Sequence, residues 1–378
     1  MEHLGSDSPQ LESSSLLSPT AVTSDALQEA THPNEYAETP LPLFKKVILT
    51  ITLPLVLVPL AIVRILLLIV LAFILVAVCA LFGKFRCLIV PTVAVLGRLF
   101  LLTFGVWPGM LHVRKPKQVV PAPVMVLAPH VGALEAFVMM YDGMPRAIAM
   151  ETYANLPVVS SIFRASGGLA VPVPASNDEA KHAAAKAASA KVAPAICDHD
   201  AAATTSSTLP AEKSASKPST LAVRKAIAAH KAAFDPSEPS RSIPLCILPE
   251  GTTHNGRSLI KFFSGAFEGG GPVQPVLLSY PYVHHHAAFF GGGMGDHVLR
   301  LLLNPWQRVE VTYLSVYHPT PEENENAELY AENVRAAMAE AAGLPMSSLG
   351  AKELRRAHVE KVKRQAALAR DGAAATTV

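Results

Sequence analysis

Cysteine is scarce in this chain, and its four cysteines are spread from Cys79 to Cys246 without a Cys-x-x-Cys pair. This spacing excludes a disulfide framework and a thiolate zinc site, and it indicates a reducing compartment. Three adjacent histidines, His284–His286, do not supply a metal site instead. Neighbouring side chains on a strand point to opposite faces, so the three cannot all reach one ion. We therefore expect no bound metal.

Charge is also sparse, because charged residues make up 16% of the chain against 50% hydrophobic residues, and the formal net charge is +2. This balance excludes a strongly basic nucleic-acid-binding protein and is typical of a membrane-attached one. The sequence contains neither a Gly-x-Ser-x-Gly motif nor an Asp-x-Asp-x-Asp-Gly loop. These absences argue against a serine hydrolase and against a calcium-binding hand.

Long hydrophobic runs, in contrast, are present, and the longest is Val47–Phe82, in which Arg64 is the only charge. As one straight helix it would extend roughly 54 Å, whereas the hydrocarbon core of a bilayer is about 30 Å thick. We therefore expect a hairpin with two legs of about 18 residues each and kinks at Pro54 and Pro59. A charge at mid-bilayer costs at least about 2.5 to 3.5 kcal/mol. Arg64 therefore favours a hairpin tip or a monotopic, re-entrant arrangement over two clean spans.

Basic residues flank this run, with Lys45 and Lys46 before it and Lys84 and Arg86 after it. Because positive residues stay on the cytosolic side, a hairpin would leave both of its ends, and the domain that follows, in the cytosol. A second apolar stretch, Cys87–Trp107, is interrupted by proline and arginine. We expect it to lie at the membrane interface or to pack against the catalytic domain.

Composition divides the remainder of the chain. Residues 1–42 are rich in Ser, Thr, Pro and Glu and are expected to be a disordered tail without the basic start of a signal peptide. Residues 43–110 form the membrane-associated hairpin and interfacial segment, and residues 111–347 form the catalytic domain. An Ala-, Ser- and Lys-rich stretch at about 176–220 is expected to be a flexible insertion in a loop. Residues 348–378 are expected to be a basic helix and tail, more typical of a solvated helix than of a membrane contact.

Within residues 111–347, apolar runs typical of strands alternate with helical patterns, which predicts an α/β fold. Val124–Ala128 is predicted to be a buried strand, and Leu134–Asp142 the helix that follows it. Between them lies the block Ala-Pro-His130-Val-Gly-Ala-Leu-Glu135. Since ligands in α/β sheets bind at the carboxyl ends of strands, His130 is well placed to contribute to a site.

Two blocks carry the candidate chemistry. Glu135 can hold one ring N–H of His130 and stabilise the imidazolium that forms when the other nitrogen takes a proton, although His130 could also be a plain strand-end cap. The second block follows the apolar run Ile243–Leu248, where a strand opens into a loop. Its backbone N–H groups and threonine hydroxyls suit a phosphate, although a simple turn would need the same glycine. It reads Leu-Pro-Glu250-Gly251-Thr252-Thr253-His254-Asn255-Gly256.

The two blocks, in this order, resemble the signatures of the lysophospholipid acyltransferases of the glycerol-phosphate acyltransferase superfamily. Three further segments sit where the family places its later elements, and the likeness covers roughly residues 43–350. The glutamate at position 135 and the wording of the second block are similar to lysophosphatidylcholine and lysophosphatidylethanolamine acyltransferases, particularly the plant type. The later segments are Phe263-Ser-Gly265-Ala-Phe267, Val273–Pro281 and Glu310–Tyr317.

The resemblance implies an α/β fold of the glycerol-3-phosphate acyltransferase type, a mixed sheet flanked by helices, with an N-terminal membrane hairpin. It also implies an enzyme of the endoplasmic reticulum membrane whose catalytic domain faces the cytosol. Its partners would be acyl-CoA as co-substrate, a lysophospholipid and membrane lipids. No cofactor and no nucleic acid are expected. The alternatives are acylation of 1-acylglycerol-3-phosphate and a catalytically weak membrane scaffold of the same fold.

The resemblance assigns catalysis to His130 and Glu135, with no covalent enzyme intermediate. Glu250 would accept hydroxyl groups or position the base. The arginine and lysine that the family usually places in its second block and before Gly265 are absent here, so Arg257 and Lys261 are the expected replacements. The full set of expected substrate-binding residues is Glu250, Gly251, Thr252, Thr253, Asn255, Arg257, Lys261 and Gly265.

Overall fold

The computed structural model describes residues 53–116, 121–150, 157–171, 218–238, 242–281, 287–289 and 294–356. The predicted N-terminal tail, most of the predicted insertion, the three adjacent histidines and residues 357–378 lie outside these ranges.

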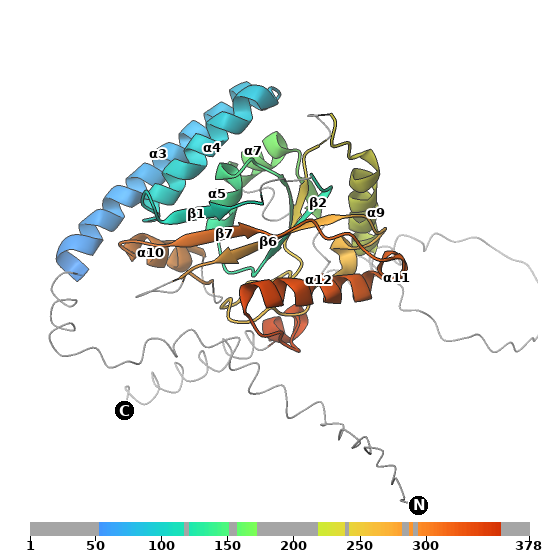
Figure 1. Cartoon of the computed structure of the whole chain (residues 1–378). Coiled ribbons are helices and arrows are strands. Elements are labelled where there is room, and N and C mark those ends of the chain that lie inside the picture. The colour runs from blue at the N-terminus through green and yellow to red at the C-terminus, as the bar shows by residue number, and fades with distance from the viewer. Residues whose placement is uncertain are drawn as a thin grey trace, which may run out of the picture.

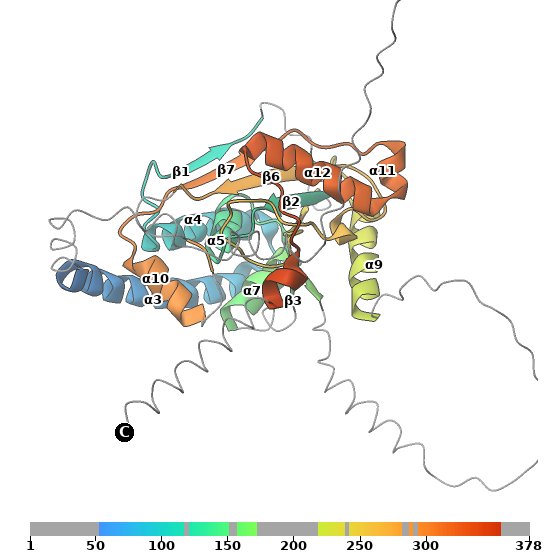
Figure 2. The same cartoon turned by 90° about the horizontal axis from the view of Figure 1, so that it is seen from below.

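A mixed seven-stranded sheet forms the centre of the described chain, in the order β1-β7-β6-β2-β5-β3-β4 (Figures 1 and 2). The strands from β6 to β4 are mutually parallel, whereas β7 runs antiparallel to β6 and is joined in parallel by β1 at the edge. The predicted mixed sheet is therefore confirmed. The strands are β1 (Leu111–Arg114), β2 (Val124–Ala128), β3 (Arg146–Met150), β4 (Leu169–Val171), β5 (Leu245–Ile247), β6 (Val273–Ser279) and β7 (Val309–Tyr313).

Helices cover both faces of this sheet, which is why β2, at its centre, is apolar and buried at every position. Met125 and Leu127 face a core shared with α4, α5 and α10, whereas Val124 and Val126 face α12 on the other side. The helices are α3 (Val58–Phe82), α4 (Arg86–Thr103), α5 (Leu134–Tyr141), α7 (Pro157–Ser166), α9 (Pro218–Ala233), α10 (Met294–Leu303), α11 (Pro321–Glu325) and α12 (Ala327–Ala342), with a π-helical turn at Leu53–Leu57 and the short helix η3 at Ser264–Ala266.

The hairpin is present, but the prediction placed its turn wrongly. α3 is one helix of 25 residues, and Pro59 lies in its first turn, where the missing N–H costs no hydrogen bond. The chain reverses at Gly83–Phe85, so the second leg is α4, the stretch that was expected to be interfacial or packed on the core. α4 packs against both α3 and α5. Both legs, Leu55–Phe82 and Arg86–Thr103, are long and apolar enough to cross a membrane.

Arg64 does not lie at a hairpin tip, as the sequence had suggested. Its side chain is only 2% exposed, and its guanidinium donates to the backbone carbonyls of Leu302 and Asn304, each at 2.7 Å, and of Pro305 at 3.0 Å. These carbonyls lie in the last turn of α10 and directly after it, at the end of a helix that attracts a cation. Arg64 therefore attaches the apolar helix α3 to the end of α10.

Candidate active site

The turn between β2 and α5 holds His130 and Glu135 in a fixed arrangement. Glu135 lies in the first turn of α5 and is buried, and its Oε2 contacts His130 Nδ1. Its other oxygen accepts from the backbone N–H groups of Val131 at 2.5 Å and Gly132 at 2.9 Å. With Nδ1 donating to a carboxylate, Nε2 is the nitrogen left to act as a base, and the histidine side chain is 24% exposed.

The electrostatic surroundings of His130 favour its protonated form. Burial opposes the charged imidazolium, but the charge and hydrogen bond of Glu135 and the charge of Glu250 outweigh it and raise the pKa of His130 above its ordinary value. The neighbouring carboxylates thus strengthen the base and stabilise the imidazolium that proton uptake produces.

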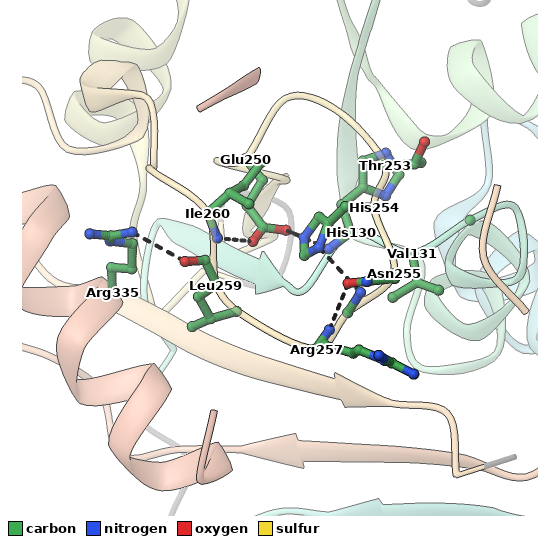
Figure 3. Close-up of polar contacts among 12 residues, drawn as sticks. His130, Val131, Glu250, Thr253, His254, Asn255, Arg257, Leu259, Ile260 and Arg335 are labelled. Carbon is green, nitrogen blue, oxygen red and sulfur yellow. Dashed lines mark hydrogen bonds and ion pairs between the residues drawn. The ribbon is translucent and has the colours of Figure 1, made fainter. Parts of the chain in front are cut away.

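Glu250, from the second block, forms hydrogen bonds to this turn and is shielded from solvent. It is completely buried, and its Oε2 accepts from the backbone N–H of His130 at 2.6 Å and from Nε2 of His254 at 2.8 Å, while Oε1 accepts from Ile260 N–H at 3.1 Å (Figure 3). Gly256 N–H donates to the other ring nitrogen of His254, so Nε2 carries the hydrogen. Three protein groups donate to its carboxylate, and this arrangement agrees with the second of its two expected roles, that of positioning the base.

The backbones of the two blocks also meet directly. β2 and β5 are adjacent parallel strands, so the loops at their carboxyl ends lie side by side. The N–H of His254 donates to the carbonyl of His130 at 3.0 Å. Gly256 has φ +72°, and a Cβ there would lie 2.9 Å from Cγ2 of Val131. Glycine allows this close approach, which brings together residues 125 positions apart in the chain.

The remaining predicted binding residues are dispersed around the same loop. Thr253 Oγ1 donates to the carbonyl of Phe289 at 2.9 Å, and the buried Asn255 accepts from Arg257 N–H at 3.1 Å. Both side chains therefore shape the loop. The Arg257 side chain extends away from Glu250 (Figure 3).

Four members of the predicted set lie on the outside of the loop or beyond it. Gly251 and Thr252 form the half-exposed bend, and Lys261 is exposed on the segment that follows. Gly265 lies in η3, which packs against α9 and α12. The structure thus does not gather all eight predicted binding residues around His130.

Sequence reasoning missed His297, which supports the catalytic turn from α10. Its Nε2 accepts from Ala133 N–H at 3.3 Å, and the side chain is 1% exposed. Burial, with a contribution from Arg300, lowers the pKa of His297 to about 4, so it is neutral and able to accept at physiological pH. No motif marks this residue, because α10 is 164 positions away and meets the turn only in the folded chain.

The segment after α12 packs on the second block and on the residues that follow it, which the sequence did not indicate. Lys261 N–H donates to the carbonyl of Leu349 at 2.8 Å, and the buried Arg335 donates to the carbonyls of Leu259 at 3.1 Å and Ser347 at 2.8 Å. Arg355 reaches the carbonyl of Gly251 at 2.5 Å. The start of the predicted basic helix and tail is therefore packed on the second block. Its buried apolar residues are Leu349, Ala351 and Leu354.

No group of three or more metal-ligating side chains occurs among the residues that the structure describes. The arrangement around His130 instead offers an oriented base beside a loop rich in hydroxyl and N–H groups. Such a site can take a proton from a bound hydroxyl group and so activate that oxygen as a nucleophile.

No protein-family model matches the chain. Curated proteins do match part of it. One stretch of 120 residues is 42% identical to the lysophospholipid acyltransferase LPEAT1 of Arabidopsis thaliana, and this match covers 32% of this chain and 30% of the relative. It is 46% identical over 101 residues to the human lysophospholipid acyltransferase LPCAT4, covering 26% and 19%. A Drosophila melanogaster lysophosphatidylcholine acyltransferase is 48% identical over 105 residues, covering 27% and 19%.

Among solved structures, the 1-acyl-sn-glycerophosphate acyltransferase PlsC of Thermotoga maritima aligns with 74% of this chain and 98% of its own, at 13% identity and a TM-score of 0.37. The segments matched in the three curated relatives span 30% or less of those relatives' own lengths. The resemblance to lysophospholipid acyltransferases is thereby confirmed over the matched segment.

Proposed function

We propose that this protein transfers an acyl chain from acyl-CoA to the free glycerol hydroxyl of a lysophospholipid at a membrane surface. The observation that carries the proposal is the oriented base, His130 with its Nδ1 held by Glu135 and its Nε2 left for a substrate proton. The sequence similarity to proteins named lysophospholipid and lysophosphatidylcholine acyltransferases supports the substrate class.

The reaction follows from the geometry of that base. His130 Nε2 takes the proton of the lysophospholipid hydroxyl as its oxygen attacks the carbonyl carbon of the thioester. The carbon–sulfur bond then breaks, and the imidazolium returns the proton to the leaving sulfur, which yields free CoA and the diacyl lipid. Glu135 stabilises the imidazolium between these two steps. No covalent enzyme intermediate is required, because the thioester is already activated.

The hairpin supports membrane attachment. α3 packs against α4, α7 and α10 along one side, and its other side exposes large apolar side chains. The basic residues Lys84 and Arg86 lie at the turn between the legs, where a lipid headgroup region suits them. We assign the hairpin to one leaflet of the endoplasmic reticulum membrane, with the catalytic domain on the cytosolic side. The exposed apolar side chains of α3 include Ile62, Leu66, Val70 and Phe73.

The test is acyl transfer by the full-length protein in microsomes, with labelled acyl-CoA and a panel of lysophospholipids. The proposal expects transfer to lysophosphatidylcholine or lysophosphatidylethanolamine. It also expects His130→Ala to lose about 10² to 10⁴ in rate, the usual contribution of a general base. His318→Ala, which alters an exposed histidine far from the turn, is the matched control and should keep the wild-type rate. Near-normal turnover by His130→Ala would overturn the mechanism.

A further inference from the structure

A groove of about 790 Å³ lies beside the catalytic turn. Pro129 and Val131, the two neighbours of His130, form one end of it together with Gly256 and Arg257. From there the groove extends over the strands at the β1 edge of the sheet, where Arg114 and Thr312 line it. Its volume lies in the range of about 300 to 1,000 Å³ that is typical of small-molecule sites.

The groove lies on the face of the sheet that α12 covers. Leu277 of β6, Thr312 of β7 and Arg114 of β1 are register partners, so their side chains project on the same side. Leu277 belongs to the core shared with α12, and the end of α12 borders the groove at Ala341 and Ala342.

The apolar hairpin lies on the other face. Val276 and Val311 alternate along their strands with Leu277 and Thr312, and both belong to the core that α3 and α4 reach through Ala61 and Leu101. Figures 1 and 2 show the α3–α4 pair and α12 on opposite sides of the sheet. A ligand in the groove is therefore separated from the hairpin by the sheet.

The charge in the groove is positive. Arg114 is exposed and Arg257 half-exposed. Among the described lining residues, the one carboxylate is Glu310, which is paired with Arg308 at 2.9 Å. Ser279 and Thr312 add hydroxyl groups. Arginine and hydroxyl donors of this kind recognise phosphate oxygens.

We propose that this groove binds the phosphate-bearing headgroup of the acyl donor, with Arg114 as a donor-specific contact. The inference rests on the proposed function. A lysophospholipid keeps its acyl chain in the membrane and reaches His130 from the hairpin side. The nucleotide headgroup of acyl-CoA carries several phosphates and is soluble in water, so a polar groove on the opposite face suits it. Its thioester end would then approach His130 past Pro129 and Val131.

The first experiment measures binding without turnover, by titration of free CoA into the full-length protein in lipid nanodiscs. Arg114→Gln should raise the dissociation constant about tenfold, the loss expected for one charge-assisted hydrogen bond to phosphate. Arg114→Glu should raise it further. Lys225→Gln removes one positive charge from an exposed position on α9 and should bind CoA like the wild type. An unchanged dissociation constant in both Arg114 variants would overturn the proposal.

The second experiment identifies which substrate the groove holds. Arg114→Gln should raise KM for acyl-CoA while KM for the lysophospholipid and kcat stay near wild-type values. With acyl-pantetheine, a donor without phosphates, variant and wild type should have equal rates. A raised KM for the lysophospholipid alone would assign the groove to the acceptor phosphate and refute the donor assignment. If the wild type acylates no lysophospholipid but CoA binding still depends on Arg114, the proposed function fails and the groove assignment stands.

Discussion

Replacing Glu250 by Gln separates the positioning of His130 from general stability. The carboxylate accepts three hydrogen bonds, from His130 N–H, His254 and Ile260 N–H, in a fully buried place. The amide of glutamine keeps one oxygen, so its NH₂ group must face at least one of these donors. Leaving one buried donor unsatisfied costs about 1 to 3 kcal/mol. At about 2 to 4 °C per kcal/mol, the apparent Tm should fall by about 2 to 12 °C.

The same substitution should lower kcat by more than the stability change explains. A misplacement of about 1 Å in a catalytic group can cost about 10²-fold, and the loop that Glu250 holds also contacts the carbonyl of His130. The assay is acyl transfer by purified protein in detergent or nanodiscs, well below the apparent Tm, with thermal unfolding of the same sample. We expect a loss of kcat of about 10²-fold with little change in KM.

Glu323→Gln is the matched control. Glu323 is 1% exposed and likewise accepts three hydrogen bonds, from Tyr317 OH at 2.7 Å, Thr320 N–H at 2.7 Å and Asn333 at 2.6 Å. It lies at the start of α11, away from the site. This variant should lose stability but keep wild-type kcat. Equal losses of kcat in both variants, or wild-type kcat in Glu250→Gln, would refute the positioning role.

Three further predictions concern the turn, the hairpin and the loop. Because the charge of Glu135 helps raise the pKa of His130, activity should fall as pH drops through a value above about 6.5. Glu135→Gln should reduce the rate and move this acid limb of the kcat/KM profile to lower pH. An acid limb at the same pH in the variant would contradict the assignment. Arg64→Leu leaves three carbonyls without their donor and should destabilise the protein by about 2 to 4 kcal/mol in thermal unfolding. Alkaline carbonate should still fail to extract this variant from membranes. An unchanged Tm would disprove the attachment of α3 through Arg64. Gly256 has φ +72° and a Cβ there would lie 2.9 Å from Val131, so Gly256→Ala should lower the free energy of unfolding by at least about 1 to 2 kcal/mol. At Gly265 no atom lies within 4 Å of an added Cβ, so Gly265→Ala should leave the stability close to that of the wild type. Equal stabilities of the two variants would contradict the steric argument.

The sequence by itself determined the parts of the site that depend on neighbours in the chain. His130 and Glu135 are separated by one turn between a strand and a helix, so their pairing follows from local geometry, and β2 begins and ends at the predicted residues. The apolar patterns on either side of His130 predicted the strand β2 and the helix α5. The pattern of β2 is apolar throughout because a buried strand has helices on both sides. The length of the apolar run led to the expectation of a hairpin, but the run supplies only one leg, α3, and the second leg is α4.

Only the tertiary structure decided the contacts between distant segments. Three sets of contacts join residues 120 to 241 positions apart: Glu250 with His130, His297 with Ala133, and Arg64 with the carbonyls at the end of α10. Nothing in the local pattern states which way these side chains point, because that depends on which strands become neighbours. The position of the hairpin turn, at Gly83–Phe85 and not inside Val47–Phe82, likewise depends on tertiary contacts. Prolines that look like kinks are harmless in a first helical turn, and a buried arginine is stable once a folded helix end accepts its hydrogen bonds.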